Sequence, residues 1–249
     1  MTLALETRGL NRSFGNLVVA DDISLRLPEG GRHALIGPNG AGKTTLINLV
    51  TGRLQPDGGQ VLLHGSDVTG AEPYRRVKAG LVRTFQINTL FAKLTPLESV
   101  AMAICERNGV SGHWVLPLSR REAELTEAYD LLAKIGLADH ATRPTGALAY
   151  GQQRLLEIAL ALAAKPKVLL LDEPAAGVPK GESGELFKVI AALPADISIL
   201  FIEHDMNLVF TFAKHITVLV QGAILLEGTP DQIKADPRVR QVYLGDAHV

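Results

Sequence analysis

Short apolar runs separated by turn sequences occupy most of this 249-residue chain. Residues 168–171 and 197–202 are almost entirely apolar, which is typical of parallel strands covered on both faces of a sheet. Residues 33–36 form a similar run, and a Pro-Glu-Gly-Gly turn at 28–31 precedes it. The pattern predicts an α/β fold built on a mixed or parallel sheet.

Further strands are predicted towards both ends of the chain. Residues 23–27 alternate apolar and polar side chains, as a half-buried strand does. The polar tail at 230–244 is predicted to be helical. The other predicted strands lie at 3–5, 16–20, 60–64, 216–220 and 223–226.

A mostly helical segment is predicted between residues 90 and 165. Thr95 is suited to cap a helix whose first residue is Pro96. Residues 120–135 carry apolar side chains at helical spacing, and we expect that face to pack, Tyr129 included.

The chain is accordingly expected to form one domain over 1–249. Its core would comprise 1–89 and 166–249, and its helical subdomain 90–165.

Charge and cysteine content narrow the range of functions. The chain has 25 basic and 26 acidic residues, so its near-zero net charge gives no argument for a nucleic-acid partner. The single cysteine, Cys105, excludes an internal disulfide and is expected to be a small buried hydrophobe. No apolar run approaches the ~20 residues that a membrane-spanning helix needs. We expect a soluble, cytosolic chain that reaches a membrane only through another subunit.

Residues 37–44 match the phosphate-binding pattern G-x-x-x-x-G-K-[ST] at every specified position. An apolar strand precedes the segment and a helical sequence follows it, as the motif requires. Backbone N–H groups would surround a polyphosphate, Lys43 would add charge, and Thr44 would offer a hydroxyl to Mg²⁺. The predicted nucleotide-binding residues here are Gly37, Pro38, Asn39, Gly40, Ala41, Gly42, Lys43, Thr44 and Thr45.

Two carboxylates, Asp172 and Glu173, follow the apolar strand at 168–171. In P-loop enzymes an Asp at such a strand end holds Mg²⁺. The adjacent Glu can orient or deprotonate the attacking water. An ordinary strand that ends in a polar loop is the alternative, and the phosphate-binding loop upstream argues against it.

Five segments in this order resemble the ATP-binding subunits of ABC transporters. They are the loop at 37–44, Gln86 in Arg-Thr-Phe-Gln, Leu-Ala-Tyr-Gly-Gln-Gln-Arg at 148–154, Asp172-Glu173, and Glu-His-Asp at 203–205. The resemblance covers essentially the whole chain. It implies a P-loop ATPase core, an N-terminal antiparallel β part, a helical insert, and ATP and Mg²⁺ as ligands.

The resemblance also implies individual roles. Phe14 would stack on adenine, with a place in the core as the alternative. Gln86 would contact Mg²⁺ and the attacking water, and His204 would contact the γ-phosphate. The implied catalytic residues are Lys43, Gln86, Glu173 and His204, and the implied metal ligands are Thr44, Gln86 and Asp172.

A second copy of the cassette is implied by the segment Tyr150, Gly151 and Gln152, which would bind the ATP held by a partner. In the family's common Leu-Ser-Gly-Gly-Gln form a serine and a glycine stand where this chain has Ala149 and Tyr150. The missing hydroxyl removes a hydrogen bond to phosphate of about 1.5–3 kcal/mol. The loop at 176–180 also lacks the family's Asp.

Sequence details resemble one subfamily, the ATPase subunits of branched-chain amino acid importers. The details are Leu-Ala-Tyr-Gly, Glu-Pro-Ala-Ala-Gly, Glu-His-Asp-Met and the stretch 237–245. Related importers carry amides, urea and small acids. The implied partners are a second ATPase subunit, identical or different, transmembrane permease subunits and, indirectly, a periplasmic or extracellular solute-binding protein. The implied location is the cytoplasmic face of the inner membrane.

Two other function classes fit less well. A P-loop GTPase would carry a guanine-reading Asn-Lys-x-Asp and a kinase an acceptor site, and the chain has no Asn-Lys-x-Asp. A soluble ABC-type ATPase acting on nucleic acid or the ribosome would carry tandem cassettes, coiled-coil insertions or a basic surface. One cassette and a net charge of −1 argue against it.

Overall fold

The computed structural model describes residues 2–84, 90–110 and 118–244. Contacts within the chain divide it into two compact units. The first unit comprises 1–83, 167–173 and 194–249, and the second comprises 84–166 and 174–193. The sequence division had assigned 174–193 to the core.

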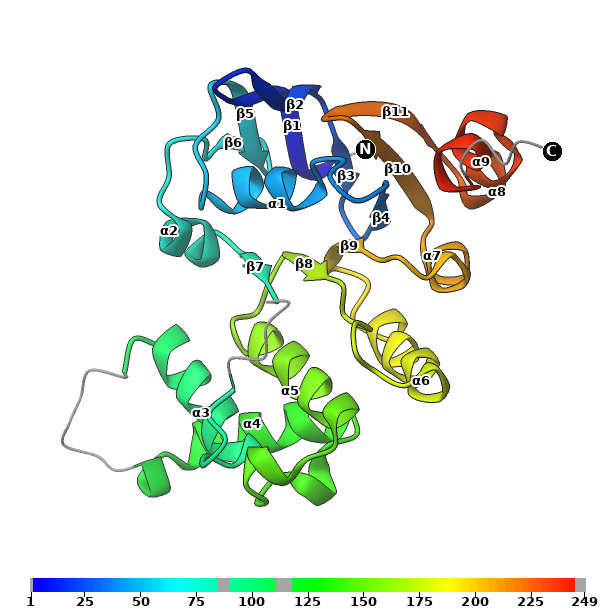
Figure 1. Ribbon diagram of the computed structural model, residues 1–249. Helices are drawn as coiled ribbons and strands as arrows, with labels where there is room; N and C mark the ends of the chain where they lie inside the picture. Colours follow the sequence, from blue (N-terminus) through cyan, green and yellow to red (C-terminus); the bar gives the residue numbers. More distant parts are fainter. Residues whose placement is uncertain (1, 85–89, 111–117, 245–249) are drawn as a thin grey trace. The chain divides into compact units, whose positions relative to one another are not determined.

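A six-stranded sheet forms the centre of the first unit, in the order β11-β10-β4-β9-β8-β7 (Figure 1). The strands from β10 to β7 are parallel to one another, and β11 pairs antiparallel with β10. The sheet expected from the apolar runs is therefore confirmed. Its strands are β4 (Arg32–Ile36), β7 (Leu81–Arg83), β8 (Val168–Asp172), β9 (Ser198–Ile202), β10 (His215–Val220) and β11 (Ala223–Gly228).

A second, antiparallel sheet contains the N-terminal strands. Its central strand β1 (Leu3–Phe14) pairs with β2 (Leu17–Ile23), β3 (Arg26–Pro28) and β5 (Gly58–Leu63), and β6 (Ser66–Asp67) extends β5. The antiparallel β part is confirmed. β1 is much longer than the expected strand at 3–5 because it pairs with three neighbours along its length.

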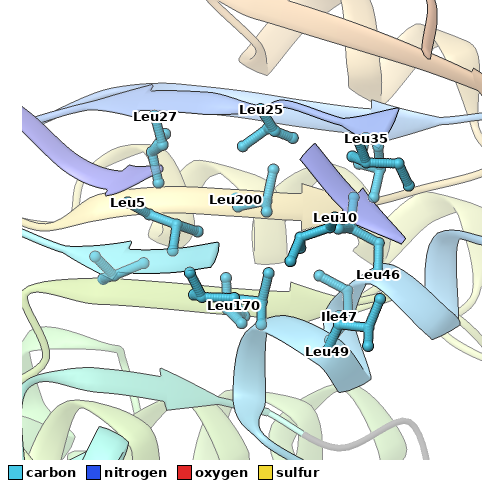
Figure 2. Close-up of a cluster of buried hydrophobic side chains, with 14 of the residues drawn as sticks. Leu5, Leu10, Leu25, Leu27, Leu35, Leu46, Ile47, Leu49, Leu170 and Leu200 are labelled. Carbon is cyan, nitrogen blue, oxygen red and sulfur yellow. The ribbon is translucent and has the colours of Figure 1, made fainter. Parts of the chain in front are cut away.

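The helix α1 (Lys43–Thr51) shares one buried cluster with both sheets of the first unit. Leu46 and Leu49 of α1 belong to the same cluster as Leu10 of the antiparallel sheet and Leu170 and Leu200 of the parallel sheet (Figure 2). Burial of each such side chain stabilises the fold by roughly 1.5–3 kcal/mol. This packing fixes α1, and with it the loop that precedes the helix.

The second unit contains four α-helices within the described residues: α3 (Pro96–Arg107), α4 (Glu122–Lys134), α5 (Tyr150–Ala163) and α6 (Lys180–Ala191). The Thr95 cap is confirmed. Its hydroxyl oxygen accepts from the backbone N–H of Glu98, and the Glu98 carboxylate accepts from the backbone N–H of Thr95. Cys105 is buried, and burial raises the pKa of its thiol.

Tyr129 corrects one sequence expectation. The helical face of α4 was expected to pack along its whole length, yet Tyr129 is 48% exposed. Leu132 is fully buried, whereas Leu125 is only partly buried, so the covered stripe is narrower at the start of α4. The helical spacing of apolar residues identifies the apolar face of α4, but it does not show how much of that face other helices cover.

The remaining helices are short and belong to the first unit. They are α2 (Pro73–Lys78), α7 (Met206–Phe212), α8 (Pro230–Ala235) and α9 (Pro237–Leu244). The helical tail expected from sequence is confirmed as two helices. Among the described residues, no helix is long and apolar enough to cross a membrane.

Arg76 of α2 is a fully buried cation that caps the C-terminal end of α1. Its guanidinium donates to the carbonyls of Leu49 and Val50 in the last turn of α1, and to those of Thr69 and Ala71. A cation there also complements the negative end of the helix dipole. Burial lowers the pKa of Arg76, and nearby Asp67 opposes that effect.

Replacing Arg76 with Met is expected to lower the free energy of unfolding by about 3 kcal/mol or more, because buried carbonyls lose their donors. Urea unfolding followed by circular dichroism measures the loss. Its matched control is Arg75→Met in the neighbouring exposed residue, which should change stability little. Equal losses in the two variants would contradict the role assigned to Arg76.

Candidate functional site

The chemistry-bearing residues of the first unit follow adjacent parallel strands. The loop at 37–42 follows β4, Asp172 ends β8, and Arg83 ends β7. His204 comes shortly after β9, which lies between β4 and β8 (Figure 1). Ligands of open α/β sheets bind outside the carboxyl ends of the strands, and the side chains gather at that edge here.

The loop at 37–42 is pressed against the main chain of two strands. A Cβ on Gly37 would lie 2.2 Å from the carbonyl oxygen of Leu219 in β10. A Cβ on Gly42 would lie 2.6 Å from that of Val19 in β2, and Gly42 has a φ of 101°. Only glycine fits these two positions without moving the strands.

Gly42 begins α1 without any side-chain cap. The first N–H groups of a helix have no acceptor within the helix, and together they present the positive end of its dipole. Thr44 is exposed in the first turn, and Thr45 is half-buried. This N-terminus is a ready site for an anion.

Lys43 is buried at 7% exposure and folds back into the loop. Its ammonium donates to the carbonyls of Gly37 at 2.7 Å and Pro38 at 2.9 Å. Burial lowers the pKa of Lys43, and the carboxylates of Glu173 and Asp172 oppose that effect. The two carboxylates are therefore close enough to act on the ammonium.

Asp172 forms a buried ion pair with Arg83 at the end of β7. The Arg83 guanidinium donates to the Asp172 carboxylate at 2.6 Å, and the two side chains are 10% and 4% exposed. The same guanidinium donates at 2.7 Å to Asn48 of α1. Arg83 thus joins the helix of the phosphate-binding motif to the strand-end carboxylate.

Glu173 has a left-handed backbone, with a φ of 49°. Such a conformation is unusual for a residue with a side chain and is concentrated at functional sites. The Glu173 carboxylate lies 2.5 Å from Nε2 of His204, which is 47% exposed. The two residues expected to act in catalysis are in direct contact.

Phe14 is on the surface rather than in the core, at 50% exposure. It ends β1, and its neighbours Leu17 and Val18 in the hairpin with β2 are also exposed. Because β2 contacts Gly42, this hairpin lies beside the phosphate-binding loop. Arg12 lies over the Phe14 ring, 4.9 Å from its centroid. The exposed ring retains a free apolar surface for a flat ligand.

The second unit carries Tyr150, Gly151 and Gln152 at the start of α5. The Gln152 side chain accepts from the N–H of Ala149, which supplies half of a capping box. Ala149 has no hydroxyl to complete it. The helix therefore begins with amide groups that its own N-cap side chain does not satisfy.

Tyr150 is held by Arg154 one turn further along α5. Arg154 donates to the Tyr150 hydroxyl at 2.7 Å and lies over its ring. Arg154 also donates to the carbonyl of Ala176 and pairs with Glu157. The ring lies against Gly177, where a Cβ would come within 3.0 Å of it. Tyr150 and Arg154 thus connect the start of α5 to the loop after Glu173.

Gln86 lies outside the described residues, as does its expected contact with Mg²⁺. Sequence reasoning missed two residues that the structure makes prominent, Arg83 and Arg154. Both lie inside the quoted motifs, three positions before Gln86 and at the end of the 148–154 segment. Arg83 could have been noticed from the sequence, because it is a charged residue at the end of a short apolar run.

The chain matches two family models. One, described as ABC transporter, covers residues 20–176, more than half of the chain. The other, described as branched-chain amino acid ATP-binding cassette transporter, covers residues 223–249. The chain belongs to the ATP-binding subunits of ABC transporters.

Curated relatives agree with this assignment over nearly their full length. The chain is 42% identical to the high-affinity branched-chain amino acid transport ATP-binding protein BraF of Pseudomonas aeruginosa over 98% of each chain. It is equally similar to LivG of Escherichia coli, with 42% identity over 98% of each chain. A solved ATP-binding cassette of an ABC transporter in its ADP conformation matches with a TM-score of 0.87 and 33% identity, covering 99% of this chain and 100% of that one.

Family membership confirms the expected P-loop ABC ATPase fold and the expected enzyme class, a transporter ATPase that binds nucleotide. It also disfavours the two alternatives from sequence, since these relatives are transport proteins rather than GTPases, kinases or ATPases of nucleic acid.

Replacing Arg83 with Met is expected to lower the free energy of unfolding by about 3–5 kcal/mol, because Asp172 then keeps a buried, uncompensated charge. Adding Asp172→Asn should restore part of the loss, which a double-mutant cycle in urea unfolding measures.

The exposed pair Arg238–Asp236 provides the control, and Arg238→Met should leave stability nearly unchanged. An Arg83→Met protein as stable as Arg238→Met would rule out a structural role for the buried pair.

Proposed function

We propose that the chain hydrolyses Mg-ATP in a dimer of cassettes and couples this reaction to import of a small polar solute. The observation that carries the proposal is the convergence of Lys43, Asp172, Glu173 and His204 at one edge of the parallel sheet. The whole chain, 1–249, would act as one ATPase domain. In this proposal, the first unit binds the nucleotide and the second unit contacts the partner subunits.

The residues of the loop fit a polyphosphate. The Lys43 ammonium has carbonyl oxygens as its partners, and phosphate oxygens would replace them as stronger, charged acceptors. The amides of α1 add donors and the helix dipole. In this proposal Gly37, Pro38, Asn39, Gly40, Ala41, Gly42, Lys43, Thr44 and Thr45 line the phosphates.

The available ligands also suit Mg²⁺, which prefers oxygen donors. The Thr44 hydroxyl is exposed at the start of α1, and the Asp172 carboxylate ends β8. We assign both as metal ligands, with Gln86 as a third from the family pattern. Bound Mg²⁺ would neutralise charge that develops on the β- and γ-phosphates. Arg83 holds the Asp172 carboxylate in place for this role.

Glu173 is the assigned general base. Its carboxylate would take a proton from water at the γ-phosphate, a role that requires a positioned acceptor. His204 contacts that carboxylate through Nε2 and would orient it. The family pattern also implies a contact between His204 and the γ-phosphate, beside Lys43. Glu173 combines a left-handed backbone directly after β8 with a side chain that contacts His204.

A second ATPase subunit would complete each nucleotide site. The start of α5, with Tyr150, Gly151 and Gln152, offers amides and the positive end of a helix dipole to the partner's γ-phosphate. In this chain the exposed Tyr150 ring lies at that helix end and is held in place by the buried Arg154. The partner is either a second copy or a related ATPase chain.

Branched-chain amino acids are the proposed solute class, with related amides and small acids next. The support is the match of residues 223–249 to the branched-chain family model and the names of the relatives. The remaining proposed partners are transmembrane permease subunits and, through them, a periplasmic or extracellular solute-binding protein. The chain would then sit at the cytoplasmic face of the inner membrane, with no nucleic-acid partner.

Replacing Glu173 with Gln is expected to reduce ATP turnover at least a hundredfold, since general-base catalysis contributes about 10²–10⁴-fold. ATP binding should survive and an ATP-dependent dimer should accumulate. Phosphate release and analytical ultracentrifugation with ATP measure the two effects.

Glu185→Gln, in an exposed carboxylate of α6, is the matched control and should turn over as the wild type does. A Glu173→Gln protein that hydrolyses ATP at the wild-type rate would exclude Glu173 as the base. If neither the wild-type protein nor Glu173→Gln binds ATP, the proposed function itself fails.

Replacing Phe14 with Ala is expected to weaken ATP binding about tenfold, because a base stacked on an aromatic ring contributes about 1–3 kcal/mol. Binding of inorganic tripolyphosphate, which has no base, should not change. Calorimetric titration of both ligands separates the two effects. Phe91→Ala, at another exposed ring, is the control, and equal loss of both ligands in Phe14→Ala would argue against stacking.

A further inference from the structure

A group of polar side chains lies at the edge of the parallel sheet opposite the nucleotide site. His33 lies near the amino end of β4, and its register partner in β10 is His215. Two residues further along β10, Thr217 is the register partner of Glu227 in β11. Paired residues project to the same face of a sheet, so the four side chains share one face. None of them takes part in the nucleotide chemistry described above.

A chain of hydrogen bonds fixes the state of the His33 ring. Thr217 donates its hydroxyl hydrogen to Glu227 at 2.6 Å, so its oxygen accepts from Nε2 of His33 at 2.7 Å. A neutral imidazole that donates from Nε2 carries a lone pair on Nδ1. His33 is 1% exposed, and its Nδ1 has no hydrogen-bond partner within the described part of the chain.

Buried polar atoms almost always have hydrogen-bond partners, so the unpaired lone pair on buried Nδ1 of His33 needs an explanation. The rings of His33 and His215 meet edge to face with centroids 4.8 Å apart. Burial and the neighbouring His215 lower the pKa of His33 to about 3, so the ring stays neutral near pH 7. Metal ions bind the neutral form of histidine.

We propose that His33, His215 and Glu227 form a binding site for a divalent transition-metal ion of the zinc class. Their ligand atoms lie within 4.8 Å of one another. Two imidazoles and one carboxylate are a ligand set that zinc uses, with bonds of about 2.0–2.2 Å. His215 is half-buried and Glu227 is exposed, so both can rotate inward to shorten the spacing.

The surroundings resemble the support that metal sites require. A ligating histidine usually donates its other N–H to an oxygen, which fixes the tautomer and the ring orientation. His33 donates to Thr217, which is itself bonded to Glu227. A bound ion would connect β4, β10 and β11, and β4 leads directly into the loop at 37–42. The ion would therefore stabilise the strand that carries the nucleotide-binding loop.

The test is zinc binding by the full chain after dialysis against a chelator, without nucleotide or Mg²⁺. Calorimetry should find one Zn²⁺ per chain, and Zn²⁺ should raise the melting temperature. Co²⁺ in the same site should give the visible absorption of a low-coordinate, nitrogen-containing site. His215→Gln and Glu227→Gln should each weaken binding at least about tenfold.

His64→Gln is the matched control, since His64 pairs with Glu29 and is not part of the cluster, and this variant should retain full affinity. His204→Ala tests whether the Glu173–His204 pair takes the ion instead. Melting curves of the metal-free variants verify that they fold.

The absence of stoichiometric binding, or equal affinity in the Glu227→Gln, His215→Gln and wild-type proteins, would overturn the proposal. So would loss of binding in His204→Ala alone. ATP turnover is measured separately, so failure of this site and failure of the proposed function are distinguishable.

Discussion

The close approach of the loop at 37–42 to two strands is the constraint on which the rest of the first unit depends. Gly37 and Gly42 contact main-chain oxygens of β10 and β2, which belong to different sheets. The amide of Gly222, in the turn between β10 and β11, donates to the carbonyl of Ala41, and the Gly222 carbonyl accepts from Asp21. Because one loop is bound to both sheets, α1, the hairpin with Phe14 and the strand-end carboxylates have fixed positions relative to the anion site.

Two arginine side chains of the first unit hold the helix that follows this loop. Arg76 satisfies the carbonyls at the end of α1, while Arg83 joins Asn48 near the middle of α1 to Asp172. Arg76 is fully buried and the Arg83 side chain is 10% exposed, and each donates to backbone or carboxylate oxygens that need donors. The helix α1, whose N-terminus follows the loop at 37–42, is thus stabilised by cations along its side and at its far end.

Much of the fold follows from local sequence patterns. The apolar runs, the turns and the Thr95-Pro96 start of α3 predict elements that the structure contains, because periodicity and capping act over a few residues. The loop at 37–44 was recognisable for the same reason. The partners of Arg83 and Arg154, and the exposure of Tyr129, depend on residues far away in sequence. No local pattern reports such contacts, so the motifs located the site but not the ion pairs that organise it.

The position of Lys43 has a consequence for how fast a nucleotide can be captured. Its ammonium points into the loop and donates to the carbonyls of Gly37 and Pro38, so the loop is folded around a cation. Under the proposed function, an incoming phosphate would replace these carbonyl acceptors instead of ordering a flexible segment. A binding-competent state that is already populated does not reduce the apparent affinity. In that proposal, the rate of nucleotide capture would be set by diffusion and by the orientation of the incoming nucleotide.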